Sequence, residues 1–188
     1  MRIIAGLFKG KKICEPKDKS TRPLKDLTKE SVFNILHHSN KFKISLKTSV
    51  ILDIFSGVGS FGLECLSRGA KKVIFIENHK YALDILKKNL ANLKIINNYE
   101  ILKKNAYEIT TFKNISKKFD LIFLDPPYKD KNIETLLNNI FKENILKTNG
   151  IVILHRHKNA NDIIPSNYTI LEEKKYGISK IIFLIQLN

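Results

Sequence analysis

Cysteine is scarce in this chain, which has two in 188 residues. Cys14 and Cys65 are far apart, and neither belongs to a Cys-x-x-Cys pair or to a cluster of cysteine and histidine. This spacing supports neither a disulfide framework nor a zinc site. We therefore expect two ordinary thiols and no bound metal.

Long apolar segments are absent as well. No apolar run approaches the roughly 18 residues that a membrane-spanning helix needs. The segment from Met1 to Ile13 also lacks the long apolar centre of a secretory signal peptide. The sequence thus predicts a cytoplasmic protein without a membrane partner.

Acidic residues are few. The chain has 18 Asp and Glu residues against 33 Lys and Arg residues, and its formal net charge is +15. A surplus of this size attracts polyanions, with nucleic acid as the leading candidate. A lysine-rich composition also results from AT-biased coding, so the distribution of charge is more informative than its total. The first 26 residues contain eight basic and three acidic side chains, which predicts a segment that grips a nucleic-acid backbone.

The length of the chain favours one domain. It is long enough to bury one sizeable core but short for two. We expect a single domain over residues 1–188, with a basic extension at 1–40 and the core at 41–188. The sequence contains no internal repeat and no linker long enough to separate domains.

Short apolar runs alternate with segments of helical periodicity from residue 50 onward. The apolar runs predict buried strands at Val50–Ile54, Val73–Glu77, Leu121–Asp125 and Ile151–Leu154. Apolar residues three and four apart predict helices within 61–66, 81–90 and 133–146. This alternation is typical of an α/β fold with a mostly parallel sheet.

The two ends of the chain add further elements. The segments Tyr168–Leu171 and Ile181–Leu187 flank a turn-like stretch around Gly177 and predict an antiparallel C-terminal hairpin. Near the other end, Leu27–His38 has the apolar spacing of a helix. Ahead of it, the segments 3–6 and 11–13 predict a small hairpin.

A glycine-rich segment follows the first predicted strand. Gly57, Gly59 and Gly62 have the spacing Gly-x-Gly-x-x-Gly between a strand and a helix, where the backbone can turn tightly and approach a ligand. Glu77 ends the next strand 20 residues after Gly57, where a carboxylate can accept both hydroxyls of a ribose. This pair of features predicts an adenosine-containing ligand.

Asp53 favours one such ligand over another. It lies four residues before Gly57, where a carboxylate can interact with an ammonium group directly or through water. S-adenosylmethionine has an ammonium group and no phosphate, whereas dinucleotide sites place their glycines to meet a pyrophosphate. The sequence therefore favours S-adenosylmethionine. An NAD-dependent oxidoreductase is the alternative, although the sequence has no evident hydride-transfer motif.

The tetrapeptide Asp125-Pro126-Pro127-Tyr128 follows a buried strand, where α/β sheets bind their ligands. Asp125 offers a carboxylate and Pro126 a carbonyl, while the prolines fix φ and remove N–H donors. Two such acceptors can hold the hydrogens of an exocyclic amine and turn its lone pair toward a sulfonium methyl group. The ring of Tyr128 can stack on a planar base. We interpret the tetrapeptide as the place of methyl transfer.

With these motifs, the chain closely resembles the RsmD-like methyltransferases, which modify the exocyclic N2 of a guanine in 16S ribosomal RNA. The resemblance spans nearly the whole chain, and its N-terminal part is the more discriminating. The matching segments are Arg2–Gly6, Lys9–Lys12, Thr21–Pro23, Glu30–Leu36, Leu52–Ala70 and Phe123–Tyr128. The resemblance implies a Rossmann-like methyltransferase fold and S-adenosylmethionine as cofactor. We also expect a monomer.

The resemblance also implies roles for individual residues. The implied cofactor contacts are Asp53, Phe55, Ser56, Gly57 and Gly59, with Glu77 at the ribose and Asn78, Asn105 and Ala106 at the adenine. The implied guanine-binding and catalytic residues are Asp125, Pro126, Pro127 and Tyr128. The implied RNA-binding residues are Arg2, Lys9, Lys11, Lys12 and Arg22. The family acts on 16S rRNA within the assembled small subunit, which implies contacts with ribosomal proteins too.

His155 and His157 depart from the family pattern. They follow the strand at 151–154, where relatives often have acidic residues, so we assign them no role and expect surface or packing positions. Two other functions also fit the motifs. The same tetrapeptide would suit methylation of adenine N6 in DNA or RNA, and the basic charge would suit a non-catalytic RNA-binding assembly protein.

Overall fold

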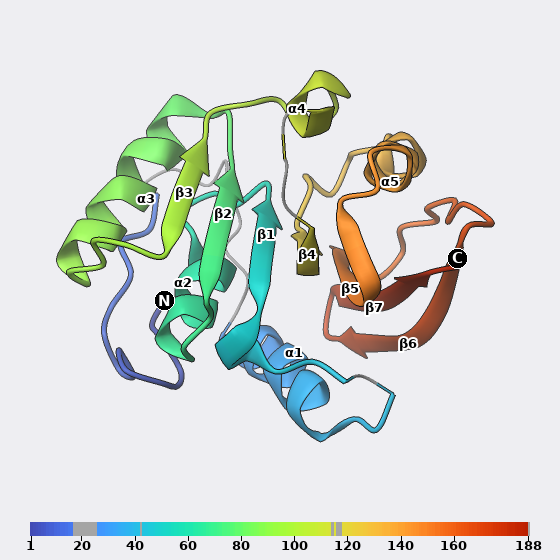
Figure 1. Ribbon diagram of the computed structural model, residues 1–188. Coiled ribbons are helices and arrows are strands. Elements are labelled where there is room, and N and C mark those ends of the chain that lie inside the picture. The colour runs from blue at the N-terminus through green and yellow to red at the C-terminus, as the bar shows by residue number, and fades with distance from the viewer. Residues whose placement is uncertain (17–25, 42, 114, 116–117, 188) are drawn as a thin grey trace.

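The computed structural model describes residues 1–16, 26–41, 43–113, 115 and 118–187. Its elements in chain order are α1 (Asp26–His38), the 3₁₀ helix η1 (Leu46–Thr48), β1 (Val50–Ile54), α2 (Ser60–Ser67), β2 (Lys72–Ile76), α3 (Lys80–Asn92), β3 (Tyr99–Leu102), α4 (Thr110–Lys113), β4 (Phe119–Leu124), α5 (Ile133–Lys142), β5 (Leu146–His157), β6 (Tyr168–Tyr176) and β7 (Ser179–Gln186). Strands and helices alternate from β1 to β5 (Figure 1), as the sequence predicts. Arg22, one of the predicted RNA contacts, lies outside the described residues.

Within the described residues, seven strands form one sheet in the order β3-β2-β1-β4-β5-β7-β6. The strands β1 to β5 run parallel, and β7 pairs antiparallel with both β5 and β6. The predicted α/β fold, with its mostly parallel sheet and antiparallel C-terminal hairpin, is therefore confirmed. The hairpin is longer than predicted, because β6 continues to Tyr176. The edge strand β3 is an element that the sequence did not reveal.

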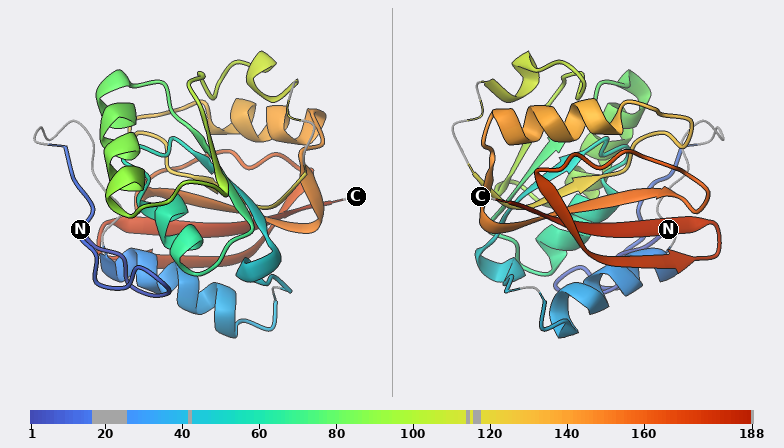
Figure 2. Two further views of the ribbon diagram at one scale, coloured as in Figure 1. Left: turned by 60° about the vertical axis from the view of Figure 1, so that its left-hand side comes forward. Right: turned by 90° about the vertical axis from the view of Figure 1, so that its right-hand side faces the viewer.

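Helices cover both faces of the sheet. Alternate strand residues point to opposite faces, so Leu121 and Phe123 join one buried cluster while Ile122 and Leu124 join another. The first cluster includes side chains of α1, α2 and α3, and the second includes side chains of α4 and α5. Figure 2 shows α1 and α5 on opposite sides of the strands. Among the described residues, no helix is both long enough and apolar enough to cross a membrane.

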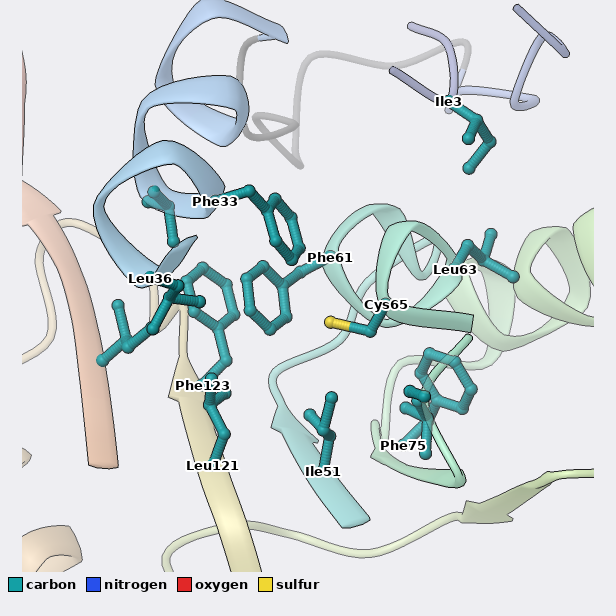
Figure 3. Close-up of a cluster of buried hydrophobic side chains, with 14 of the residues drawn as sticks. Ile3, Phe33, Leu36, Ile51, Phe61, Leu63, Cys65, Phe75, Leu121 and Phe123 are labelled. Atoms are coloured by element: carbon teal, nitrogen blue, oxygen red, sulfur yellow. The ribbon is translucent and has the colours of Figure 1, made fainter. Parts of the chain in front are cut away.

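Three phenylalanine rings join α1, α2 and β4 in the first cluster (Figure 3). The ring of Phe61 stacks on that of Phe123, with centroids 3.9 Å apart, and on that of Phe33, with centroids 5.2 Å apart. The same cluster contains Ile3 and Ile13 from the N-terminal segment. The extension therefore shares one buried cluster with the sheet.

The first residues form the small hairpin predicted from the sequence. Arg2 and Lys12 are bridged antiparallel, and the N–H of Ile3 donates to the carbonyl of Lys11 at 2.9 Å. The hairpin is held by hydrogen bonds to the helices beside it. For example, the side-chain oxygen of Asn89 in α3 accepts the N–H of Cys14, which directly follows the hairpin, at 2.7 Å.

A buried ion pair anchors the hairpin to α1 and α2. The carboxylate of Glu64 is fully buried and accepts the N–H groups of Ile4 at 2.8 Å and Ala5 at 3.0 Å. Lys29, also fully buried, has its Nζ 3.7 Å from Glu64 Oε2 and donates to the carbonyl of Arg2 at 2.8 Å. Burial lowers the pKa of Lys29, and the charge of Glu64 offsets part of this effect. The chain's own side chains thus fix the position of the basic hairpin.

Gly62 of α2 lies directly against β2, and an alanine there tests this contact. A Cβ added at Gly62 would lie 2.2 Å from Phe75 Cε1 and 2.9 Å from Val73 Cγ1. We expect Gly62→Ala to lower the free energy of unfolding by about 1–3 kcal/mol through overpacking, measured by urea denaturation. Adding Phe75→Leu should restore part of the loss, because it removes the ring that the new methyl group meets. Equal stability of Gly62→Ala and the wild type would contradict this packing.

Candidate active site

Three acidic side chains meet at the carboxyl edge of the parallel strands. Asp53 lies in β1, Glu77 directly follows β2 and Asp125 directly follows β4. The strand β1 pairs in parallel with β2 on one side and with β4 on the other, so these strand ends lie at one edge of the sheet (Figure 1). The N–H of Asp125 donates to the carbonyl of Ile54 at 3.3 Å. The predicted cofactor loop and the predicted tetrapeptide are therefore neighbours.

The loop between β1 and α2 turns through three residues in the left-handed region of backbone space. Phe55, Gly57 and Gly59 have φ values of 60°, 54° and 87°. Glycine is needed at 59 for a second reason, because a Cβ there would lie 2.4 Å from Leu86 Cδ1. The N–H of Ser56 donates to the carbonyl of the last residue of β2 at 3.1 Å. The loop is thus tied to two strands and enters α2 in a defined conformation.

The carboxylate of Glu77 holds this loop from the side of β2. Its Oε2 accepts the N–H of Gly57 at 2.8 Å, and its Oε1 accepts the N–H groups of Asn78 and His79 at 2.9 Å each. Glu77 therefore already orders the backbone around the predicted cofactor site. Each carboxylate oxygen can accept more than one hydrogen bond, so contacts with ribose hydroxyls are compatible with this arrangement.

Asp53 is a buried carboxyl group in a negative environment. It is 1% exposed, and its Oδ2 accepts the N–H of Gly62 at 3.0 Å. Burial raises the pKa of Asp53 well above its usual range, and the charges of Asp125 and Glu77 raise it further, while the hydrogen bond from Gly62 offsets part of the increase. A positively charged ligand group would relieve this repulsion. The site is therefore suited to a cationic ligand and poorly suited to a pyrophosphate.

Ser56 supplies an observation that points to a ligand. Its Oγ is buried and has no hydrogen-bond partner among the described residues, an arrangement that folded proteins generally avoid. The remaining predicted adenine contacts lie beyond β3, where Ala106 is buried and Asn105 Oδ1 accepts the N–H of Tyr107 at 3.1 Å. The ring of Tyr107 lies 5.3 Å from that of Phe55, centroid to centroid. These groups fit a small polar ligand with an aromatic ring.

A buried arginine holds the tetrapeptide, and the sequence interpretation missed it. Arg156 of β5 is 2% exposed and donates to the carbonyls of Pro127 at 2.9 Å and Asp130 at 2.6 Å. Its Nε also donates to both oxygens of Asp162, at 3.1 and 2.9 Å. Because Pro127 and Tyr128 follow each other directly, Arg156 fixes the segment that presents the tyrosine. An arginine at the end of an otherwise apolar strand is the signal that could have revealed it.

His155 is the second residue that the sequence interpretation missed. It is buried, as a packing residue would be, but its Nδ1 lies 2.7 Å from Asp125 Oδ1. Its ring centroid lies 5.9 Å from that of Tyr128, and the centroid of His157 lies 5.4 Å from the same ring. Both imidazoles thus flank the tetrapeptide. The two histidines are two residues apart on β5, the strand that pairs with β4. This spacing places both on the same face of the sheet, and it is the signal that could have revealed them.

The predicted RNA contacts belong to a different segment of the chain from the three acidic side chains. Within the described part of the chain, they are the exposed side chains of Arg2, Lys9, Lys11 and Lys12, all on the N-terminal hairpin. No group of three or more His, Cys, Asp or Glu side chains with the geometry of a metal site is present among the described residues. The chain therefore has a basic hairpin and an acidic site in which Asp53 is buried and Glu77 and Asp125 are partly buried.

Comparison with known proteins identifies the family. The model of the family described as Conserved hypothetical protein 95 matches residues 1–185. The chain belongs to this family. One relative in it, the Ribosomal RNA small subunit methyltransferase D of Haemophilus influenzae, is 36% identical over 179 residues, which cover 95% of this chain and 90% of the relative. The resemblance predicted from the sequence is therefore confirmed.

Two solved structures extend the likeness to the fold. A Haemophilus influenzae protein described as a methylase superposes with a TM-score of 0.76 at 34% identity, covering 100% of this chain and 98% of the other. An Escherichia coli protein described as a methyltransferase superposes with a TM-score of 0.81 at 27% identity, covering 99% and 97%. The predicted methyltransferase fold is confirmed.

Proposed function

We propose that this protein transfers a methyl group from S-adenosylmethionine to the exocyclic N2 of a guanine in 16S ribosomal RNA. The observation that carries the proposal is the juxtaposition of the glycine loop after β1 with the tetrapeptide after β4. The names of the relatives support ribosomal RNA as the substrate class. We further propose a monomeric, cytoplasmic enzyme that acts on the small ribosomal subunit.

The residues around the glycine loop fit the proposed cofactor. When bound, S-adenosylmethionine supplies a methyl group on a positively charged sulfur, which a nucleophile can displace. Asp53 would face the ammonium group, the buried Oγ of Ser56 would gain a partner, and Glu77 would accept the ribose hydroxyls. The further proposed contacts are Phe55, Gly57, Gly59, Asn78, Asn105 and Ala106. The acidic surroundings of Asp53 support this cofactor over a dinucleotide.

The tetrapeptide would orient the nucleophile. A guanine N2 amine is a poor nucleophile because its lone pair is delocalised into the ring. We propose that the carboxylate of Asp125 and the carbonyl of Pro126 accept its two hydrogens, which turns the lone pair toward the methyl group. Pro127 keeps the acceptors rigid, and stacking on Tyr128 would contribute about 1–3 kcal/mol to binding of the base. Arg156 would hold Tyr128 in place for this contact.

A methylation assay with tritiated S-adenosylmethionine tests the proposal. Free 16S rRNA and assembled small subunits from cells that lack the protein serve as substrates, and mass analysis of the nucleosides identifies the product. We expect label in N2-methylguanine, with the assembled particle as the better substrate. Label in N6-methyladenine would favour the adenine alternative. Calorimetry that shows no uptake of S-adenosylmethionine would favour a non-catalytic RNA-binding protein.

The lysines of the N-terminal hairpin should control affinity for RNA. Each lost phosphate contact lowers the slope of log K against log salt concentration by about 0.7–0.9. We therefore expect alanine at Lys9, Lys11 and Lys12 together to lower the magnitude of this negative slope by about 2–3, measured by filter binding. Affinity for S-adenosylmethionine should not change. The matched control replaces three exposed lysines on α5 and β6, Lys142, Lys174 and Lys175. Equal slopes for the two triple variants would contradict the role of the hairpin.

A further inference from the structure

The hydrogen bond between His155 and Asp125 selects one of the two carboxylate oxygens. His155 is 3% exposed, and its Nδ1 lies 2.7 Å from Asp125 Oδ1. An ionised carboxylate only accepts hydrogen bonds, so the hydrogen of this bond belongs to Nδ1. The contact therefore engages Oδ1 and leaves Oδ2 for another donor. Asp125 itself is only partly buried, with its side chain 21% exposed, so Oδ2 can reach a ligand.

Apart from Nδ1, the imidazole of His155 contributes little to the stability of the fold that an apolar side chain could not contribute. His155 Nε2 is buried and has no hydrogen-bond partner among the described residues, and a buried acceptor without a partner destabilises the fold. A leucine at this position would remove that unpaired acceptor. The unpaired Nε2 therefore gives no reason for a histidine here. Among the described residues, the bond to Asp125 is the only side-chain hydrogen bond of His155, and a hydrocarbon could not make it.

We propose that His155 is a positioning residue for the methyl transfer, holding Asp125 so that Oδ2 accepts a hydrogen of the target amine. The inference rests on the proposed function and adds to it a residue outside the tetrapeptide. His155 has this place because β5 pairs in parallel with β4, with Leu154 beside Leu124. The next residues along the chain are then His155 on β5 and Asp125, which directly follows β4. Without Nδ1–H, the carboxylate would rotate among several orientations.

Three substitutions separate positioning from packing. The side-chain amide of His155→Asn can replace Nδ1–H, whereas the longer amide of His155→Gln reaches toward the position of Nε2, and His155→Leu has no donor. We expect kcat with small subunits to fall about 10- to 100-fold for the Leu and Gln variants. The Asn variant should stay within a few-fold of the wild type. Affinity for S-adenosylmethionine should be similar in all three, and urea denaturation checks that each variant is folded under the assay conditions, which excludes misfolding as the cause.

Each outcome decides a different claim. A Leu variant with the kcat of the wild type, or an Asn variant as slow as the Leu variant, would overturn the role of His155. Ring ¹⁵N NMR tests the hydrogen bond without any assay of activity: we expect the Nδ1–H tautomer at His155, and the Nε2–H tautomer would also overturn the inference. A wild-type protein that binds S-adenosylmethionine but methylates neither RNA nor subunits would instead overturn the proposed function.

Discussion

Replacing Asp125 with alanine is expected to lower kcat for methyl transfer by at least about 100-fold. The carboxylate is one of the two proposed acceptors of the amine, and loss of one preorganised polar group from a reaction site costs about 10²- to 10³-fold in rate. Affinity for S-adenosylmethionine should remain within about threefold of the wild type, because the proposed cofactor contacts lie mainly on the loop after β1. Single-turnover assays on small subunits measure the rate, and calorimetry measures the affinity.

Asp125→Asn is the matched control for this experiment. Its single carbonyl oxygen can face either His155 or the amine, and its NH2 group, which donates, then faces the remaining donor. We expect its kcat to lie between those of the alanine variant and the wild type. Undiminished turnover by Asp125→Ala would refute the proposed role of the tetrapeptide, whatever the asparagine variant does.

The central strands and the site loops were predictable because their patterns are local. Buried strands such as β1 and β4 read as continuous apolar runs, and the glycine loop and the tetrapeptide directly follow them. The strand β3 (Tyr99–Leu102) was not predictable in this way. It lies at the edge of the sheet and all four of its residues are only partly buried, so its sequence has no apolar run to distinguish it from a loop.

The contacts of His155 and Arg156 could not be predicted from the sequence, because their partners are distant in the chain. Each role depends on β5 lying next to β4 in a particular register, with Leu154 beside Leu124. Alternation along the strand then sends His155 to the face of Asp125 and Arg156 to the face of α5. A sequence pattern predicts that strands exist, but it does not give the register that makes two of their residues neighbours.

The buried ion pair of Lys29 and Glu64 could not be predicted for a related reason. Charged side chains on helices are mostly exposed, so neither residue has a signal of burial in its own helix. The hairpin at residues 1–16 covers them, and its backbone N–H groups satisfy the Glu64 carboxylate. The charge count identified a basic segment at this end of the chain. It did not predict that the same segment closes one face of the core.

Removing the charge of Asp53 should raise the stability of the ligand-free protein and lower its affinity for S-adenosylmethionine. Burial raises its pKa in the folded state, whereas in the unfolded chain the pKa is about 3.9. The stability that its protonation contributes is therefore fully present below about pH 3.9 and is lost as the pH rises through the folded-state pKa. Asparagine does not titrate. Its amide oxygen can still accept the N–H of Gly62, which Asp53 accepts at 3.0 Å.

We therefore expect ligand-free Asp53→Asn to have a higher Tm than the wild type at pH 8, with the difference shrinking as the pH falls toward 4. Each kcal/mol gained corresponds to about 2–4 °C for a chain of this size. Affinity for S-adenosylmethionine should fall about 10- to 100-fold, because a charged partner of the ammonium group is lost. Asp84→Asn, at an exposed position of α3, is the matched control. A pH-independent difference in Tm would contradict the burial argument, and unchanged affinity would contradict the ammonium contact, so the two claims fail separately.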